Sequence, residues 1–145
     1  MPAATSPAGA RGLMQLMPSV GRQVATGLKF PLWDVALLHQ ADVNVQLGTR
    51  HLASLLQSYG GDEALTLAAY NAGRSRVTRW LTKRGTADRE VFIERIPYVE
   101  TRDYVRIILR NKELYRSLYG WPAPGARESQ GGVRDAPTSA GGEIR

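Results

Sequence analysis

Residues Ser6 to Pro18 read Ser-Pro-Ala-Gly-Ala-Arg-Gly-Leu-Met-Gln-Leu-Met-Pro, and this stretch decides how the chain is interpreted. Its first half is rich in Pro, Ala, Gly and Ser, a composition typical of loops. The apolar run from Gly12 to Met17 is too short to be assigned to a helix or a strand by periodicity. We therefore expect at most a small β hairpin near residues 8–17, followed by a short helix with Ser19 as its N-cap.

Helical periodicity dominates the residues that follow. It is clearest over 42–59, where apolar side chains recur at three- and four-residue steps and Asp42 is expected as the N-cap. Gly48 inside this helix costs roughly 1 kcal/mol against Ala, so we expect another part of the chain to pack closely against it. The remaining helices are expected at about 34–39, 63–71 with Asp62 as N-cap and Gly73 as its end, 75–83, 90–95 and 99–119. The sequence thus predicts a mainly α fold.

Composition restricts the class of protein. The 145 residues, 43% hydrophobic and 22% charged, are typical of one globular domain. After position 120 the chain is dominated by Pro, Gly, Ala and Ser, so we expect a domain over 1–120 and a disordered tail over 121–145. The absence of cysteine from the sequence excludes disulfides and thiolate chemistry. No apolar run approaches the roughly 20 residues of a membrane span, and no signal peptide is visible.

Four segments together resemble one known family. They are Ser6–Pro18; Asp42-Val43-Asn44-Val45-Gln46-Leu47-Gly48 with His51-Leu52; Ala68-Ala69-Tyr70-Asn71-Ala72-Gly73 with Arg76-Val77; and Ile96-Pro97-Tyr98-Val99-Glu100-Thr101-Arg102-Asp103-Tyr104-Val105. In this order they resemble the motifs of lytic transglycosylases of the soluble type, over nearly all of residues 2–119. In that family the second segment usually reads Asn-Ile, Gly, then Tyr-Leu. The resemblance implies a lysozyme-like α+β fold around a glycan cleft.

The resemblance also implies a substrate and a set of binding residues. Family members cleave the β-1,4 bond between N-acetylmuramic acid and N-acetylglucosamine, and the muramoyl C6 hydroxyl closes on C1 to leave a 1,6-anhydro end. No metal or other cofactor is expected. Amides that both donate and accept hydrogen bonds suit a glycan site, as do apolar platforms beneath sugar rings. The residues expected to line the cleft are Gln15, Met17, Ala69, Tyr70, Asn71, Glu100 and Tyr104.

Each of these residues has a structural alternative. Met14 and Met17 are also suited to a core, and Tyr70 to a core aromatic with one satisfied hydroxyl. Asn71 near Gly73 is typical of a helix C-cap, which the residues alone favour. Glu100 in a first helical turn is favoured by the helix dipole. The two histidines, at positions 39 and 51, are expected on helix faces, away from any metal site.

The catalytic acid is the main departure from the family pattern. Family members use one glutamate as general acid and then general base, within a Glu-Ser-x-Phe-x-Pro pattern. If that proline is matched to Pro2, the glutamate falls ahead of Met1, and the first carboxylate of this sequence is Asp34. No catalytic residue is therefore assigned, and nothing in the sequence gives Glu94 or Glu100 the glutamate's position. We expect an N-terminally truncated domain whose parent acts in the cell envelope, in the periplasm or cell wall.

The sequence is compatible with three classes of function. The first is a peptidoglycan lytic transglycosylase domain, expected to be monomeric and to bind glycan strands. A goose-type lysozyme that hydrolyses the bond shares the fold of this first class, but the segment from Ile96 to Arg102 favours the transglycosylase. The second is a truncation that binds peptidoglycan without cleaving it. The third, nucleic-acid binding, rests on the net charge of +6 and on Arg-rich stretches. It is disfavoured because no aromatic-basic motif of an RNA-binding module is present.

Overall fold

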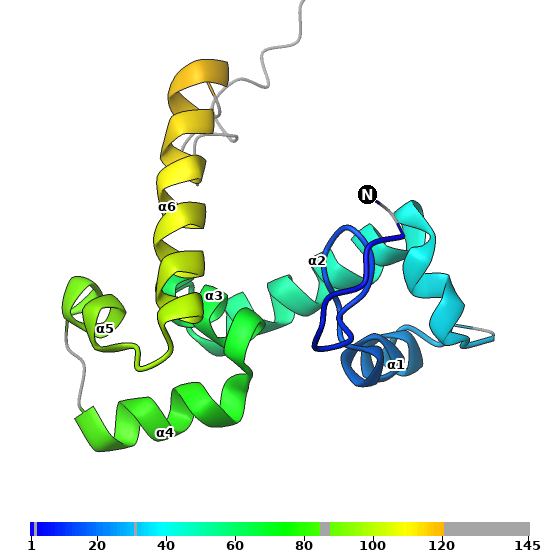
Figure 1. Cartoon of the computed structure of the whole chain (residues 1–145), viewed down its shortest axis with the longest axis horizontal. Coiled ribbons are helices and arrows are strands. Elements are labelled where there is room, and N and C mark those ends of the chain that lie inside the picture. The colour runs from blue at the N-terminus through cyan, green and yellow to red at the C-terminus, as the bar shows by residue number, and fades with distance from the viewer. Residues whose placement is uncertain (2, 31, 85–87, 121–145) are drawn as a thin grey trace, which may run out of the picture. The chain divides into compact units, whose positions relative to one another are not determined.

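The structure is a computed structural model that describes residues 1, 3–30, 32–84 and 88–120, except the side chain of residue 84. The tail expected over 121–145 lies outside the described residues. The elements of the described part, in chain order, are α1 (Pro18–Gly27), the 3-10 helix η1 (Val35–His39), α2 (Ala41–Ser58), α3 (Glu63–Ala72), α4 (Arg74–Arg84), α5 (Arg89–Arg95) and α6 (Val99–Tyr119). The predicted mainly α fold is confirmed (Figure 1).

Of the three N-caps named above, one is confirmed and two are wrong. Asp62 accepts a hydrogen bond from the backbone N–H of Leu65 (2.9 Å), as expected of an N-cap. The structure also shows Asp34 capping η1. Ser19, however, lies inside α1, because Pro18 already has the fixed φ of a first helical residue and the N-cap is Met17. Asp42 likewise lies in the first turn of α2, which begins after Gln40.

The expected hairpin near residues 8–17 is reduced to a single antiparallel bridge. The backbone N–H of Arg11 donates to the carbonyl of Leu16 (2.9 Å), and the N–H of Leu16 donates back (3.0 Å). A second isolated bridge joins Thr5 to Arg11. The described N-terminal residues are thus a compact loop, held by backbone hydrogen bonds, that leads into α1.

The chain divides into two compact units, Met1–Leu109 and Arg110–Arg145. The first unit has two groups of buried side chains. One group comes from the N-terminal loop, α1, η1 and the first half of α2: Leu16, Ala25, Leu38, Val43 and Leu47. The other group comes from the end of α2 through α6: Leu55, Ala64, Leu67, Ala68, Ala69, Ala72, Val77, Trp80, Phe92, Ile93, Ile96 and Val105. We call them the N-terminal core and the C-terminal core.

Helix α2 contributes to both cores because its apolar side chains recur along the whole helix. In Figure 1 it runs from the N-terminal loop and α1 toward α3. Val43 and Leu47 lie in the N-terminal core and Leu55 lies in the C-terminal core, as the helical spacing predicts. One straight element of 18 residues therefore supports both halves of the first unit.

The second unit is described only through residue 120. Within it, the rings of Tyr115 and Tyr119 stack with centroids 5.8 Å apart, and Arg116 pairs with Glu113 (3.1 Å). Tyr115 and Leu118 occupy apolar positions of the helix expected over 99–119, but both side chains are well exposed. None of the described helices is long and apolar enough to cross a membrane.

Candidate functional site

The loop from Arg11 to Met17 has an unusual backbone that points to a specific role. Gly12 has a φ of +75°, and a Cβ at this position would lie 2.2 Å from both the Leu38 carbonyl oxygen and Asn44 Nδ2. Gln15 has a φ of +49°, which a residue with a side chain rarely adopts. Its exposed side chain donates from Nε2 to the carbonyl of Gly12 (2.8 Å). The loop thus presents one amide at the surface in a defined conformation.

Asn44 of α2 anchors this loop through hydrogen bonds to its backbone. Its side chain is fully buried, at 0% exposure. Nδ2 donates to the carbonyls of Arg11 (2.9 Å) and Leu38 (2.8 Å), and Oδ1 accepts from the backbone N–H of Met14 (2.7 Å). A buried amide is stable only when its polar atoms are paired. Asn44 belongs to one of the four family-like segments, but no local pattern predicts its role, because its partners are 6, 30 and 33 residues away.

The close packing expected at Gly48 is present. A Cβ on Gly48 would lie 2.6 Å from the Cβ of Met14, a distance that real side chains essentially never show. Asn44 and Gly48 are four residues apart and share a face of α2. Met14 is half-buried and packs against the N-terminal core, which agrees with its structural alternative.

Tyr70 of α3 joins this loop to the rest of the first unit. Its hydroxyl donates to the carbonyl of Met14 (2.8 Å), and its ring packs against both cores. The His51 ring lies 5.4 Å from the Tyr70 ring, at a tilt of 44°. Burial raises the pKa of Tyr70, with a further contribution from the neighbouring Tyr104. Burial also lowers the pKa of His51, and the nearby Arg74 lowers it further.

Asn71 does not cap its helix, so the interpretation that the residues alone favoured is wrong. The C-cap of α3 is Gly73, whose N–H donates to the carbonyl of Ala69 (2.8 Å). The Asn71 side chain is exposed, and its Oδ1 accepts a hydrogen bond from the hydroxyl of the buried Thr101 (2.7 Å). Thr101 therefore orients the Asn71 amide from α6, a contact that no local pattern in either helix signals.

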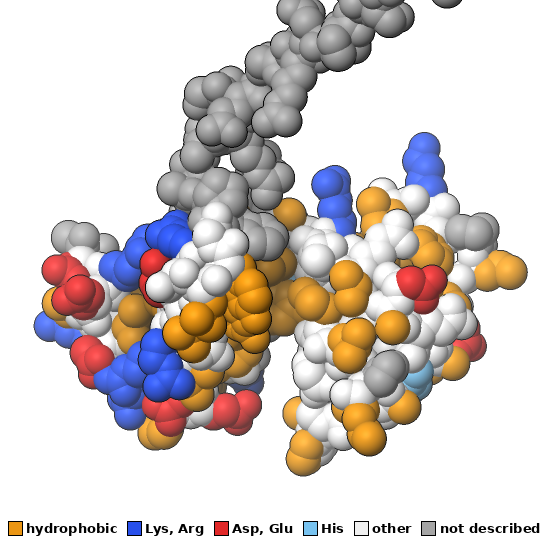
Figure 2. Space-filling view, turned by 90° about the horizontal axis from the view of Figure 1, so that it is seen from above, with side chains coloured by type: hydrophobic (Ala, Val, Ile, Leu, Met, Phe, Trp, Pro, Cys, Tyr) orange, Lys and Arg blue, Asp and Glu red, His pale blue; other side chains and the backbone are white. Residues whose placement is uncertain are grey.

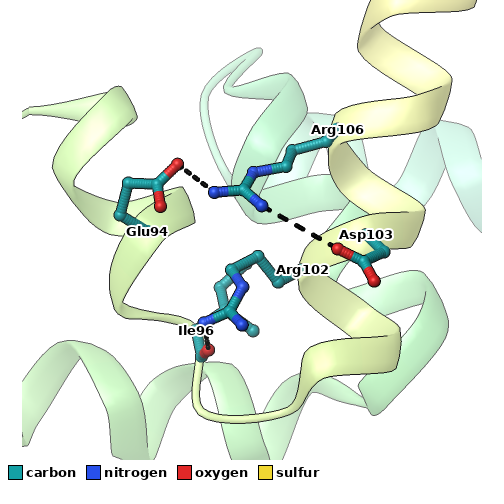
Figure 3. Close-up of polar contacts among 5 residues, drawn as sticks. All are labelled: Glu94, Ile96, Arg102, Asp103 and Arg106. Carbon is teal, nitrogen blue, oxygen red and sulfur yellow. Dashed lines mark hydrogen bonds and ion pairs between the residues drawn. The ribbon is translucent and has the colours of Figure 1, made fainter.

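Polar contacts between α5 and α6 hold the first turns of α6 in place (Figure 3). Arg106 pairs with Glu94 of α5 and with Asp103 (3.8 Å), and Arg102 donates to the carbonyl of Ile96 (3.4 Å). Figure 2 shows Lys, Arg, Asp and Glu side chains gathered on the left-hand side of the molecule and fewer of them on the right-hand side. These contacts set the position of the α6 segment that carries Glu100 and Tyr104.

The expected cleft residues fall into distinct environments. Tyr70 and Tyr104 are neighbours, both half-buried, and burial raises the pKa of Tyr104 as well. Met17 is 40% exposed at the start of α1. Glu100 is exposed in the first turn of α6. Ala69 is only 3% exposed and belongs to the C-terminal core, so a cleft role for its side chain stays a prediction.

Four of the described carboxylates have partners that do not suit a general acid. Asp34 and Asp62 accept backbone N–H groups at helix starts, and so does Asp88. The hydrogen bond from Arg106 lowers the pKa of Glu94, whereas an acid that donates a proton near neutral pH needs a raised pKa. Among the described residues, no group of three or more His, Cys, Asp or Glu side chains could hold a metal ion.

Comparison with known proteins decides the family. The family model of the transglycosylase SLT domain matches residues 1–93, more than half of the chain. The chain belongs to the transglycosylase SLT domain family. The sequence of this SLT domain is 36% identical over 121 residues to the soluble lytic murein transglycosylase of Escherichia coli strain K12. It is 39% identical over 118 residues to the putative soluble lytic murein transglycosylase of Haemophilus influenzae.

Solved structures agree with this assignment. The SLT domain matches the X-ray structure of the lytic transglycosylase Slt of Pseudomonas aeruginosa, an inactive Glu-to-Gln mutant, with a TM-score of 0.77 at 38% identity over 86% of this chain. It matches a complex of the 70-kDa soluble lytic transglycosylase with bulgecin A with a TM-score of 0.75 at 37% identity over 82% of this chain. The chain spans about a fifth of the length of these relatives: 19% and 20% of the two curated sequences and 20% of each structure. The fold is therefore that of the lytic transglycosylases, as the four motifs predict.

Proposed function

We propose that this SLT domain binds peptidoglycan glycan strands and belongs to an enzyme that cleaves the bond between N-acetylmuramic acid and N-acetylglucosamine with formation of a 1,6-anhydro end. Membership of the transglycosylase SLT family supports the reaction class. The observation that carries the glycan site is the anchored loop of Arg11 to Met17, joined through Met14 to Tyr70. The proposal places the parent protein in the cell envelope, where this substrate is found, and treats the domain as a monomer.

The residues expected in the cleft have chemistry that suits acetylated sugars. The amides of Gln15 and Asn71 both donate and accept hydrogen bonds, as the acetamido and hydroxyl groups of the glycan require. Each is held by a neighbour, Gln15 by the Gly12 carbonyl and Asn71 by Thr101. Such preorganisation reduces the entropy lost on binding. The remaining members of the proposed glycan-binding set are Met17, Ala69, Tyr70, Glu100 and Tyr104.

The proposal assigns the proton transfer to a glutamate that is not one of the carboxylates of this sequence. A single acid suffices, because the C6 hydroxyl of the substrate replaces water as the nucleophile. The relative from Pseudomonas aeruginosa was solved as an inactive mutant with Gln in place of Glu, which supports one indispensable glutamate. In this chain Asp34 and Asp62 accept backbone N–H groups at helix starts, Glu94 pairs with Arg106, and Glu100 lies exposed in the first turn of α6. The chain by itself is then expected to bind without turnover.

The experiment compares two proteins on purified peptidoglycan sacculi. One is the chain as given, and the other is the chain preceded by the residues that precede the matched region in the Escherichia coli relative. Mass spectrometry of the released muropeptides should find 1,6-anhydro products only with the extended protein. Anhydro products from the chain as given would show that an internal carboxylate acts. Hydrolysed, reducing ends would instead indicate a lysozyme-type reaction, and no product with sacculus binding retained would indicate a binding module.

A further inference from the structure

The buried amide of Asn44 makes three hydrogen bonds, and each fixes backbone. Two of its partners, the carbonyl of Arg11 and the N–H of Met14, lie in the loop that presents Gln15. The third, the carbonyl of Leu38, lies at the end of η1. One side chain of α2 therefore satisfies polar groups on both sides of Gly12, at the point where the loop has no room for a Cβ.

Gln15 depends on this anchor for its conformation. Its backbone is in the left-handed region, and its side chain bonds the carbonyl of Gly12, the residue between two Asn44 contacts. A left-handed residue other than Gly is strained and persists only where its surroundings determine it. The N–H of Gln15 also donates to the Gly12 carbonyl (3.1 Å). Both the side chain and the backbone N–H of Gln15 therefore bond the carbonyl of Gly12. If the Asn44 contacts were lost, this carbonyl would no longer be held in place.

We propose that Asn44 is the positioning residue of the glycan site: it does not touch the ligand, but holds the loop so that the Gln15 amide is presented in one orientation. The inference rests on the proposed function, because it assigns Gln15 a role in ligand binding. It goes beyond that function by naming a buried residue outside the cleft as a determinant of affinity. The inference states that Asn44 affects ligand affinity through the position of Gln15, and this makes it testable by non-additivity.

The test is a double-mutant cycle read by calorimetric titration with bulgecin A, which binds a relative of known structure. Gln15→Ala and Asn44→Ala should each weaken binding about tenfold, and the double variant should weaken it about tenfold as well. Additive losses, about a hundredfold in the double variant, would overturn the inference, as would unchanged affinity in Asn44→Ala. The matched control is Leu55→Ala, which creates a cavity in the C-terminal core and should leave the affinity unchanged at a temperature where it is folded.

Binding by the wild type and hydrogen exchange separate the possible failures. If the wild-type chain does not bind bulgecin A, the proposed function fails and the inference fails with it. If the wild type binds but the cycle is additive, only the inference fails. If Asn44→Ala does not fold, hydrogen exchange of the wild type decides. The N–H of Met14 should exchange at least a hundredfold more slowly than in an unstructured peptide of the same sequence, and unprotected exchange would overturn the inference.

Discussion

The hydroxyl of Tyr70 donates a 2.8 Å hydrogen bond to the backbone carbonyl of Met14, 56 residues earlier in the chain. This bond joins α3 to the loop that carries Gln15, and the Tyr70 ring packs against both cores of the first unit. The same Met14 is held through its N–H by Asn44 and packs its side chain on Gly48. Met14 therefore attaches the loop to both α2 and α3.

Removal of the Tyr70 hydroxyl should destabilise the domain without disturbing its packing. Tyr70→Phe retains the ring and leaves the Met14 carbonyl without its side-chain donor, so the free energy of unfolding should fall by about 1 kcal/mol. The measurement is urea denaturation followed by circular dichroism. Tyr119→Phe, at an exposed position of α6, is the control and should have almost no effect. Equal stability of the two variants would show that the hydrogen bond is not important.

Substitution of Gly48 should be far more costly than substitution of a glycine in open surroundings. Gly48→Ala brings a methyl group against Met14, and overpacking of this kind costs roughly 1–3 kcal/mol. Gly27→Ala is the matched control, because a Cβ there meets nothing within 4 Å at the end of α1. It should be neutral or slightly stabilising. Thermal denaturation of both variants decides the point, and a Gly48→Ala protein as stable as Gly27→Ala would contradict the close packing.

Much of the fold follows from local patterns, and the exceptions have physical reasons. Asp62 is predictable as an N-cap because an Asp directly before the first residue of a helix is a strong capping signal. Asp42 and Ser19 are not N-caps because each helix begins one residue earlier, at Ala41 and at Pro18. Gln40 and Met17 have no side-chain cap bond, so no capping signal precedes either helix.

Thr101 should control the orientation of the Asn71 amide. Thr101→Val keeps the shape of the buried side chain but removes the donor to Asn71 Oδ1. We expect bulgecin A affinity to fall several-fold, with a loss of about 1 kcal/mol in stability, as measured by calorimetric titration and urea denaturation. The control is Thr49→Val, because the exposed Thr49 hydroxyl bonds only within α2. Wild-type affinity in Thr101→Val would argue against a binding role for Asn71.

Stability should depend on pH through His51. Its pKa is lowered below the usual 6.5 in the folded state by burial and by Arg74. The unfolded chain therefore binds a proton more readily than the folded one, and stability should fall as the pH falls from about 6.5 through the lower folded pKa. The measurement is the unfolding free energy against pH for the wild type and His51→Gln. The variant should lose this part of the pH dependence, and identical slopes would contradict the assignment.

The site was less predictable than the fold, because its connections are long-range. Tyr70 and Asn71 were singled out by a local motif, yet their partners Met14 and Thr101 come from the loop and from α6. The need for close packing at Gly48 could be inferred from the cost of glycine in a helix, but its neighbour Met14 could not. Asn44 had no local signal at all, since its role exists only when η1, α2 and the loop are assembled.

The most direct test of the central claim is a nuclear magnetic resonance titration of the chain with bulgecin A. The account predicts saturable chemical-shift changes on the amides of Gln15 and Asn71 and around Tyr70 and Tyr104. Smaller changes at Met14 would follow from the hydrogen bond it accepts from Tyr70. Shift changes confined to α1 or to the end of α6 would contradict the claim that these residues form a glycan site. So would the absence of any shift change at a bulgecin A concentration that saturates the relative.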